Sequence, residues 1–172
     1  MDLEEKVLEE KLIHKGNFLE FVNVDVELPN KEKANRDVVK HPGAAAVLAF
    51  LDDENIILVE QYRLALKQVM IEIPAGKLDK NEDPKVCAIR ELEEETGYKA
   101  GDIEYLGKIA TAPGFCDEII YIYKAKNLTL GEKHEDEDEF TNVKIVNINR
   151  VKEMIKKGEI IDCKTLSAFA FL

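Results

Sequence analysis

The sequence predicts an α/β fold of the α+β type, in which helices pack on a mixed β-sheet. Three observations favour it: strand patterns dominate the first half of the chain, a clear helix follows residue 83, and strands return before a helical tail. Strand and helix patterns do not alternate regularly, and no segment repeats. A mixed-sheet sandwich is therefore favoured over a doubly wound parallel fold.

Residues 1–40 are expected to form an N-terminal extension of helix and strand. Residues 2–12 carry leucines and a valine at roughly helical spacing, which predicts a short helix that is marginally stable alone. Residues 18–28 (FLEFVNVDVEL) alternate apolar and polar positions, as a half-buried strand does. After a turn at 29–31, residues 36–40 can return as a second strand, which gives an antiparallel β extension.

The remaining strands are predicted from apolar runs separated by turn residues. They are expected at 44–51, 56–62, 69–73, 103–111, 119–125 and 143–148. A very acidic loop at 132–139 precedes the last of them. From Arg150 the tail is predicted to form two helices, which are separated by Gly158 and end in the apolar sequence AFAFL.

The helix expected at 84–96 has the clearest boundaries. Asp83 can cap its first turn, Pro84 suits the first helical position, and Gly97 favours its end. The apolar positions expected to face the core are Val86, Ile89 and Leu92.

Size and composition limit the class of protein. A chain of 172 residues fits one domain, 1–172. The formal net charge of −11 argues against a nucleic-acid partner, because binding the phosphate backbone requires clustered Lys and Arg. An acidic protein that acts on an anionic substrate needs cations at the site, and metal ions held by carboxylates are one source.

Cysteine usage and hydropathy indicate a cytoplasmic protein with no membrane partner. The three cysteines are an odd number without CxxC spacing, so we expect reduced thiols. The charged N-terminal residues do not resemble a signal peptide, and the chain has no apolar run long enough to span a membrane.

An unusual concentration of carboxylates lies in residues 90–95 (RELEEE). On a helix each residue advances about 100°, which places Glu94 and Glu95 about 60° and 40° either side of Glu91. An ordinary solvated face, with Arg90 paired to Glu94, is the alternative interpretation. Because like charges at these spacings repel, a divalent cation between them is favoured, and Mg²⁺ or Mn²⁺ suits such hard oxygen ligands.

Nine residues of this region stand at spacings that would rarely match by chance. They are Gly76, Glu82, Arg90, Glu91, Leu92, Glu94, Glu95, Gly97 and Tyr98. In this arrangement the segment resembles the Nudix box, GX₅EX₇REUXEEXGU, in which U is an apolar residue. The resemblance implies the Nudix fold, an α/β/α sandwich around a mixed β-sheet.

The resemblance also implies a metal site. Glu91 and Glu95 are the expected principal ligands, with Glu94 as a further ligand and the Ala75 carbonyl beside them. Glu95 is also counted among the catalytic residues. Two or more Mg²⁺ ions, with Mn²⁺ as a possible substitute, would activate a water molecule that attacks one phosphorus of a pyrophosphate, without a covalent enzyme intermediate.

Four further box residues are expected to support the ligands. Arg90 and Glu82 would orient the carboxylates and brace the loop. Gly76 would allow a close approach that a side chain hinders, and Gly97 would end the helix.

Motifs outside the box resemble the ADP-ribose pyrophosphatase subgroup in order and spacing. They are residues 36–44 (RDVVKHPGA), 60–63 (EQYR), 72–76 (EIPAG) and 112–118 (APGFCDE). The resemblance implies hydrolysis of ADP-ribose, a nucleoside diphosphate linked to another group, to AMP and ribose 5-phosphate.

By the same resemblance, four residues would bind the substrate. Arg36 and Arg63 would contact phosphates or ribose, and Glu118 a ribose or adenine group, with Gly114 in the same loop. For each arginine the alternative is an ordinary surface position.

The acidic loop supplies the expected catalytic base. In the subgroup a glutamate from the corresponding loop is the base or a further metal ligand, and Glu139 and Glu137 are the candidates. The alternative is that the loop simply faces water.

The subgroup also commonly forms homodimers by exchange of N-terminal strands. Residues 18–28 and the apolar tail could cover such an interface.

Two competing functions remain open from the sequence. The chain could be a Nudix hydrolase for another substrate, such as a nucleotide sugar, a dinucleotide polyphosphate or a damaged nucleoside triphosphate. It could also bind ADP-ribose or a relative without cutting it, although the presence of every box glutamate favours an enzyme.

Overall fold

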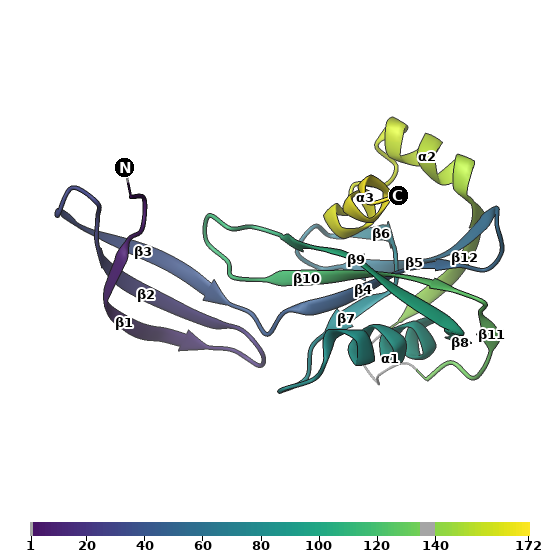
Figure 1. The fold of residues 1–172 in the computed structure, drawn as a ribbon, viewed down its shortest axis with the longest axis horizontal. Coiled ribbons are helices and arrows are strands. Elements are labelled where there is room, and N and C mark those ends of the chain that lie inside the picture. The colour runs from purple at the N-terminus through teal and green to yellow at the C-terminus, as the bar shows by residue number, and fades with distance from the viewer. Residues whose placement is uncertain (1, 135–139) are drawn as a thin grey trace. The chain divides into compact units, whose positions relative to one another are not determined.

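The computed structural model describes residues 2–134 and 140–172 (Figure 1). Within these ranges the chain forms two compact units. The first contains the chain up to Gly43 together with Ala110–Ile119, and the second contains Ala44–Ile109 and Ile120–Leu172. The assignment of 1–172 to one domain, with residues 1–40 as its extension, stays a prediction.

In the described part of the first unit, three antiparallel strands form one sheet in the order β1-β2-β3 (Figure 1). The strands are β1 (Lys6–Lys15), β2 (Glu20–Glu27) and β3 (Lys33–Lys40). Val22, Val24 and Val26 are buried because alternate residues of β2 share one face of the sheet. The predicted antiparallel β extension is therefore confirmed.

The helix predicted at residues 2–12 is wrong, because most of this segment belongs to β1. All ten residues of β1 are exposed, so the helical spacing of its leucines faces no core that could stabilise a helix. Pairing with β2, from Lys6 opposite Glu27 to Lys15 opposite Glu20, gives the backbone hydrogen-bond partners instead.

A mixed sheet forms the centre of the second unit, and it has seven strands among the described residues. Its main path is β12-β5-β4-β10-β9, with β6 paired to β5 and β7 paired to β4. The sheet is mixed because β10 runs parallel to β4 whereas β5 runs antiparallel to it. The strands are β4 (Ala44–Phe50), β5 (Asn55–Arg63), β6 (Gln68–Glu72), β7 (Ala75–Lys77), β9 (Asp102–Ala110), β10 (Ile119–Lys126) and β12 (Thr141–Asn147).

Helices cover both faces of this sheet, with α1 on one side and α2 and α3 on the other (Figure 1). Successive side chains of β4 point to opposite faces of the sheet, which explains the three layers. Its even-numbered residues from 44 to 48 pack with residues of α2 and α3, and its odd-numbered residues from 45 to 49 pack with α1. The α/β/α sandwich is thus confirmed.

The helices are α1 (Pro84–Thr96), α2 (Ile148–Lys157) and α3 (Cys163–Ala170). A separate pair of short strands, β8 (Tyr98–Lys99) and β11 (Thr129–Leu130), is antiparallel.

Helix α1 begins and ends where the sequence predicts. The Asp83 carboxylate accepts a hydrogen bond from the backbone N–H of Lys85. Gly97 has a φ of 75°, and its N–H donates to the Glu93 carbonyl. Since a side chain is strained at this φ, glycine favours termination here.

The predicted core side of α1 is partly wrong. Leu92 is buried, but Val86 and Ile89 are 55% and 36% exposed. The buried face comprises Cys87, Ala88, Glu91, Leu92, Glu95 and Thr96. The spacing of the apolar residues did not predict this orientation of α1, because two of the inward positions are occupied by glutamates.

None of the described helices is long and apolar enough to cross a membrane.

Candidate active site

Strand β7 brings the backbone of Gly76 directly against the acidic helix. A Cβ atom at this position would lie 1.9 Å from the carboxylate carbon of Glu91. Real Cβ atoms do not approach other atoms so closely, so any side chain here would displace that carboxylate. Glycine therefore allows Glu91 to lie on the loop backbone.

Arg90 connects the loop and the helix. Its Nε and Nη2 atoms each donate to the Glu82 carboxylate at 3.0 Å. Its Nη1 atom donates to Glu91 at 2.7 Å and to Glu94 at 2.8 Å, and Nη2 also donates to the Lys77 carbonyl at 3.2 Å. One guanidinium thus faces three carboxylates, as expected of a residue that orients the acidic groups.

These contacts determine the protonation of their neighbours. The hydrogen bond from Arg90 lowers the pKa of Glu82 to about 2, and the same bond raises the pKa of Arg90 above its ordinary value. Burial, reinforced by the charge of Glu91, raises the pKa of Cys87 to about 12. The Cys87 thiol therefore stays protonated at neutral pH and is no nucleophile.

Glu95 lies against the same loop from the next turn of α1. Its side chain is buried, and its carboxylate accepts a hydrogen bond from the Ala75 N–H at 3.2 Å. The structure therefore brings together Ala75, Gly76, Glu91 and Glu95, all predicted from the sequence.

His134 in the acidic loop and Thr141 after it both bond the last turn of α1. The His134 N–H donates to the Glu94 carbonyl at 3.2 Å, and the Thr141 hydroxyl donates to the Glu95 carbonyl at 3.3 Å. The predicted base candidates, Glu137 and Glu139, lie outside the described residues.

The donor chemistry of this face fits a divalent cation. Glu91, Glu94 and Glu95 offer hard oxygen atoms from adjacent turns, and a single guanidinium offsets only part of their charge. Within residues 2–134 and 140–172 no three acidic, histidine or cysteine side chains already surround one ion position. Arg90 bonds Oε1 of Glu91 and Oε2 of Glu94, so one guanidinium restrains both carboxylates of this face.

Arg63, at the end of β5, is part of an ion-pair network that the sequence analysis missed. Its Nε and Nη2 atoms donate to the Glu72 carboxylate at 2.8 and 2.6 Å. Burial raises the pKa of Glu72, but the bond from Arg63 and the charge of Lys164 outweigh it, so this pKa lies below its ordinary value. Arg63 is therefore paired with a buried carboxylate, and its contact with a substrate stays a prediction.

The sequence contains a signal for this network. Glu72 stands between two isoleucines at the end of β6, and Lys164 is the one charged residue of α3. A charged residue within an apolar element indicates a buried ion pair when a partner of opposite charge is close.

Three predicted substrate-binding residues line one cavity in the first unit, namely Arg36, Gly114 and Glu118. Its volume is about 520 Å³. Arg36 pairs there with Glu5 at 2.6 Å, a partner that the sequence analysis did not identify.

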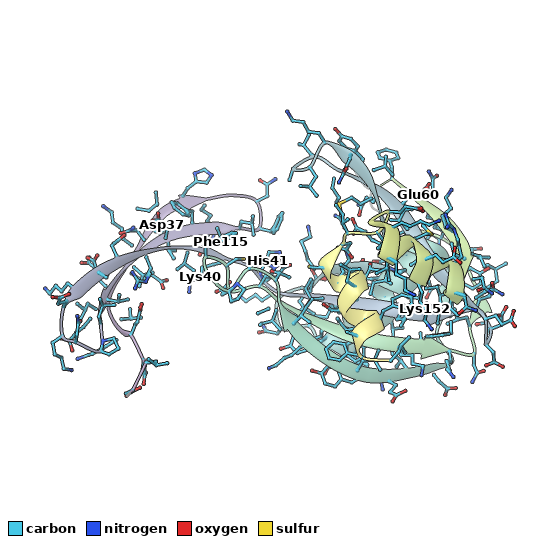
Figure 2. All side chains as sticks on the ribbon, turned by 90° about the horizontal axis from the view of Figure 1, so that it is seen from above. Asp37, Lys40, His41, Glu60, Phe115 and Lys152 are labelled. Atoms are coloured by element: carbon cyan, nitrogen blue, oxygen red, sulfur yellow. The ribbon has the colours of Figure 1, made fainter. Side chains whose placement is uncertain are left out.

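Glu118 is held inside the first unit by two neighbours. Its carboxylate accepts a hydrogen bond from the Thr111 hydroxyl at 2.7 Å and lies 3.4 Å from Nε2 of His41. Figure 2 places Lys40, His41 and Phe115 close together in this unit, where the Val39 N–H donates to the Phe115 carbonyl at 2.7 Å.

The fold and the box geometry define the class of protein as a Nudix hydrolase. In agreement, residues 40–168 match the family model of the NUDIX domain, and the chain belongs to this family.

Two relatives cover nearly the whole chain. The methanol dehydrogenase activator of Bacillus methanolicus is 46% identical over 98% of this chain and 92% of its own. The ADP-ribose pyrophosphatase of Bacillus subtilis (strain 168) is 45% identical over 99% of this chain and 93% of its own. A solved structure described as an ADP compounds hydrolase superimposes with a TM-score of 0.86 over 99% of this chain and 94% of that chain, at 20% identity, which confirms the fold.

The stability contributed by the Glu82–Arg90 pair should depend on pH. Because the folded-state pKa of Glu82 is about 2 against 4.5 for an unperturbed group, the contribution is complete above pH 4.5 and is lost as the pH falls toward 2. We expect Glu82→Gln to lower the free energy of unfolding by about 2 kcal/mol at pH 7, and by progressively less below pH 4.5.

Urea titrations between pH 7 and pH 3 measure this difference. The matched control is Glu104→Gln, which alters an exposed glutamate of β9. A difference between wild type and Glu82→Gln that stays constant over the whole range would contradict the prediction.

Proposed function

We propose that the chain is a Mg²⁺-dependent pyrophosphatase that hydrolyses ADP-ribose to AMP and ribose 5-phosphate. The observation that carries this proposal is the acidic face of α1 packed against β7, with Glu91 on Gly76 and Glu95 bonded to Ala75. The 45% identity to an ADP-ribose pyrophosphatase supports the choice of substrate.

Glu91, Glu94 and Glu95, with the Ala75 carbonyl, would hold the metal. Two or more Mg²⁺ ions, or Mn²⁺ as a substitute, would lower the pKa of a bound water molecule and offset the charge of the pyrophosphate oxygens. Such ions also provide the positive charge that a chain of net charge −11 needs to bind a diphosphate.

The other box residues arrange these ligands. Arg90 restrains Glu91 and Glu94 through Nη1 while Glu82 holds the opposite side of the guanidinium. The water oxygen would form a bond to one phosphorus, the bond from that phosphorus to the bridging oxygen would break, and the two phosphates would leave as separate products. No enzyme side chain forms a bond to phosphorus.

A carboxylate of the acidic loop, Glu139 or Glu137, would accept the proton of the attacking water. The support is that His134, before these two candidates, and Thr141, after them, bond the last turn of the helix that carries the proposed ligands. A base must lie within hydrogen-bond reach of the water.

We expect Glu139→Gln to reduce kcat by at least about tenfold, because the amide cannot accept the proton. If the alignment of the loop is shifted by two residues, Glu137→Gln will show this loss instead. The control is Glu132→Gln, whose side chain is 86% exposed. Rates within about threefold of wild type for both loop variants would remove the base assignment.

Arg36, Gly114 and Glu118 in the first unit, and Arg63 in the second, are the proposed substrate contacts. The shared cavity supports the first three. Arg63 is supported by its partial exposure, since 39% of its side chain is accessible while Glu72 holds it in place.

A homodimer is also proposed. Exposed apolar side chains on β1 support it, since Val7, Leu8, Leu12 and Ile13 are between 43% and 59% exposed. Light scattering at working concentration should give twice the 19.5 kDa of one chain. A mass of one chain would remove the dimer.

The 46% identity to a methanol dehydrogenase activator favours a second candidate function, the activation of a dehydrogenase. The two relatives are almost equally similar to this chain, so identity alone does not choose between them. Adding the purified protein to a methanol dehydrogenase tests this function directly.

The decisive test is incubation of the protein with Mg²⁺ and ADP-ribose, followed by chromatography of the products. We expect AMP and ribose 5-phosphate from wild type, and a kcat at least about 100-fold lower for Glu95→Gln, which lacks one proposed ligand. Chelation of divalent ions should abolish turnover.

The Glu95→Gln variant also controls for contaminating activity. Cleavage of GDP-mannose or a dinucleotide polyphosphate in place of ADP-ribose would overturn the substrate but keep the metal chemistry. Tight binding of ADP-ribose without Mg²⁺-dependent turnover would indicate a binding domain.

A further inference from the structure

A group of charged side chains is buried in the second unit, outside the Nudix box. The side chains of Glu72, Lys164 and Asp162 are only 2%, 8% and 11% exposed. Their charges are paired, because Lys164 Nζ donates to Glu72 and, at 3.1 Å, to Asp162. Burying several charges is costly even when they are paired, because the desolvation penalty can exceed the Coulombic gain, so this arrangement requires a reason.

The group ends at the guanidinium of Arg63. Glu72 is held by Lys164 on α3 and in turn accepts the bonds from Nε and Nη2 of Arg63. Among the described residues Nη1 of Arg63 makes no further hydrogen bond, and 39% of the side chain is exposed. The buried end of the network is therefore fully paired, while its outer end presents an N–H group to solvent.

The same part of α3 also holds the backbone that leads to the box. The Thr165 hydroxyl accepts the Ile73 N–H at 2.9 Å, and Asp162 accepts both the N–H and the hydroxyl of Thr165, at 2.9 and 2.6 Å. Two residues later, the Ala75 N–H donates to Glu95. The segment from Glu72 to Ala75 is thus attached to α3 at one end and to the acidic helix at the other.

Loss of Lys164 would change the position of Arg63. Glu72 would keep one cationic partner in place of two in a buried site, and it would be free to rotate toward the remaining guanidinium. Among the described residues, the side-chain hydrogen bonds of Arg63 are its two parallel bonds to this carboxylate. A rotation of Glu72 would therefore carry Nη1 with it.

We propose that Lys164 is a positioning residue for the diphosphate of the substrate, acting through Glu72 to hold Arg63 with Nη1 directed at a phosphate oxygen. The inference rests on the proposed function for the identity of the substrate. Lys164 itself is buried and touches no substrate. A guanidinium held along one edge suits this role, since its other edge is pre-oriented for an anion.

A double-mutant cycle tests this pathway. Lys164→Met should raise KM for ADP-ribose about tenfold and change kcat by less than about threefold, because the lost interaction serves binding. Arg63→Met should raise KM at least as much. If Lys164 acts through Arg63, adding Lys164→Met to Arg63→Met should raise KM by less than about twofold, whereas independent effects would multiply.

Three controls separate positioning from stability. Lys164→Arg keeps the charge and should restore KM to within about threefold of wild type. Lys152→Met removes an exposed lysine of α2 (Figure 2) and should leave KM unchanged. Thermal denaturation reports stability, and if Lys164→Met does not fold, Lys164→Gln, which keeps a hydrogen-bond donor, takes its place.

The same cycle is measured with methylenediphosphonate and Mg²⁺ by calorimetry, so that binding is tested without turnover. If the protein does not cut ADP-ribose, but the effects of Lys164→Met and Arg63→Met on the affinity for methylenediphosphonate are coupled, the proposed function is refuted and the inference is supported. If the protein cuts ADP-ribose, but the increases in KM caused by Lys164→Met and Arg63→Met multiply in the double variant, the function is supported and the inference is overturned. Absence of coupling in both measurements also overturns it.

Discussion

The structure depends on keeping two carboxylates, Glu91 and Glu95, buried on one face of α1. Glu91 and Glu95 turn inward from α1, where a helix of this fold would ordinarily bury apolar residues. Arg90 bonds Glu91 together with Glu82 and Glu94, and the Ala75 N–H donates to Glu95. Removing the charge of such a group would leave buried carboxylates uncompensated, which is far more costly than the loss of a surface ion pair.

A consequence is that the short segment from Glu72 to Gly76 carries two charge systems. At one end Glu72 meets Arg63 and Lys164, and at the other the backbone of Ala75 and Gly76 lies on the acidic face of α1. Helices from both layers of the sandwich, α3 on one face and α1 on the other, therefore hold this one stretch of backbone. The mixed sheet supplies the rigidity, because β7 pairs with buried residues of β4, Ala44 to Ala46.

Patterns that depend on neighbouring residues were predictable. The caps of α1 at Asp83 and Gly97 follow from local backbone chemistry, and the alternation of β2 follows from the two-residue period of a strand. The prediction of a helix at residues 2–12 failed because helical spacing indicates a helix only when a core receives its apolar side. The orientation of α1 was also missed, since no count of apolar residues predicts that glutamates face inward.

The sequence by itself determined the family, the boundaries of the acidic helix and the type of ligand it offers, because these depend on residue identity at short spacings. Only the tertiary structure decided that Gly76 lies on Glu91 and that Glu5 pairs with Arg36. It also decided that Lys164 reaches Glu72 from 92 positions away in the chain. Such contacts arise from the packing of distant elements, and short-range periodicity contains no information about which buried charges will meet.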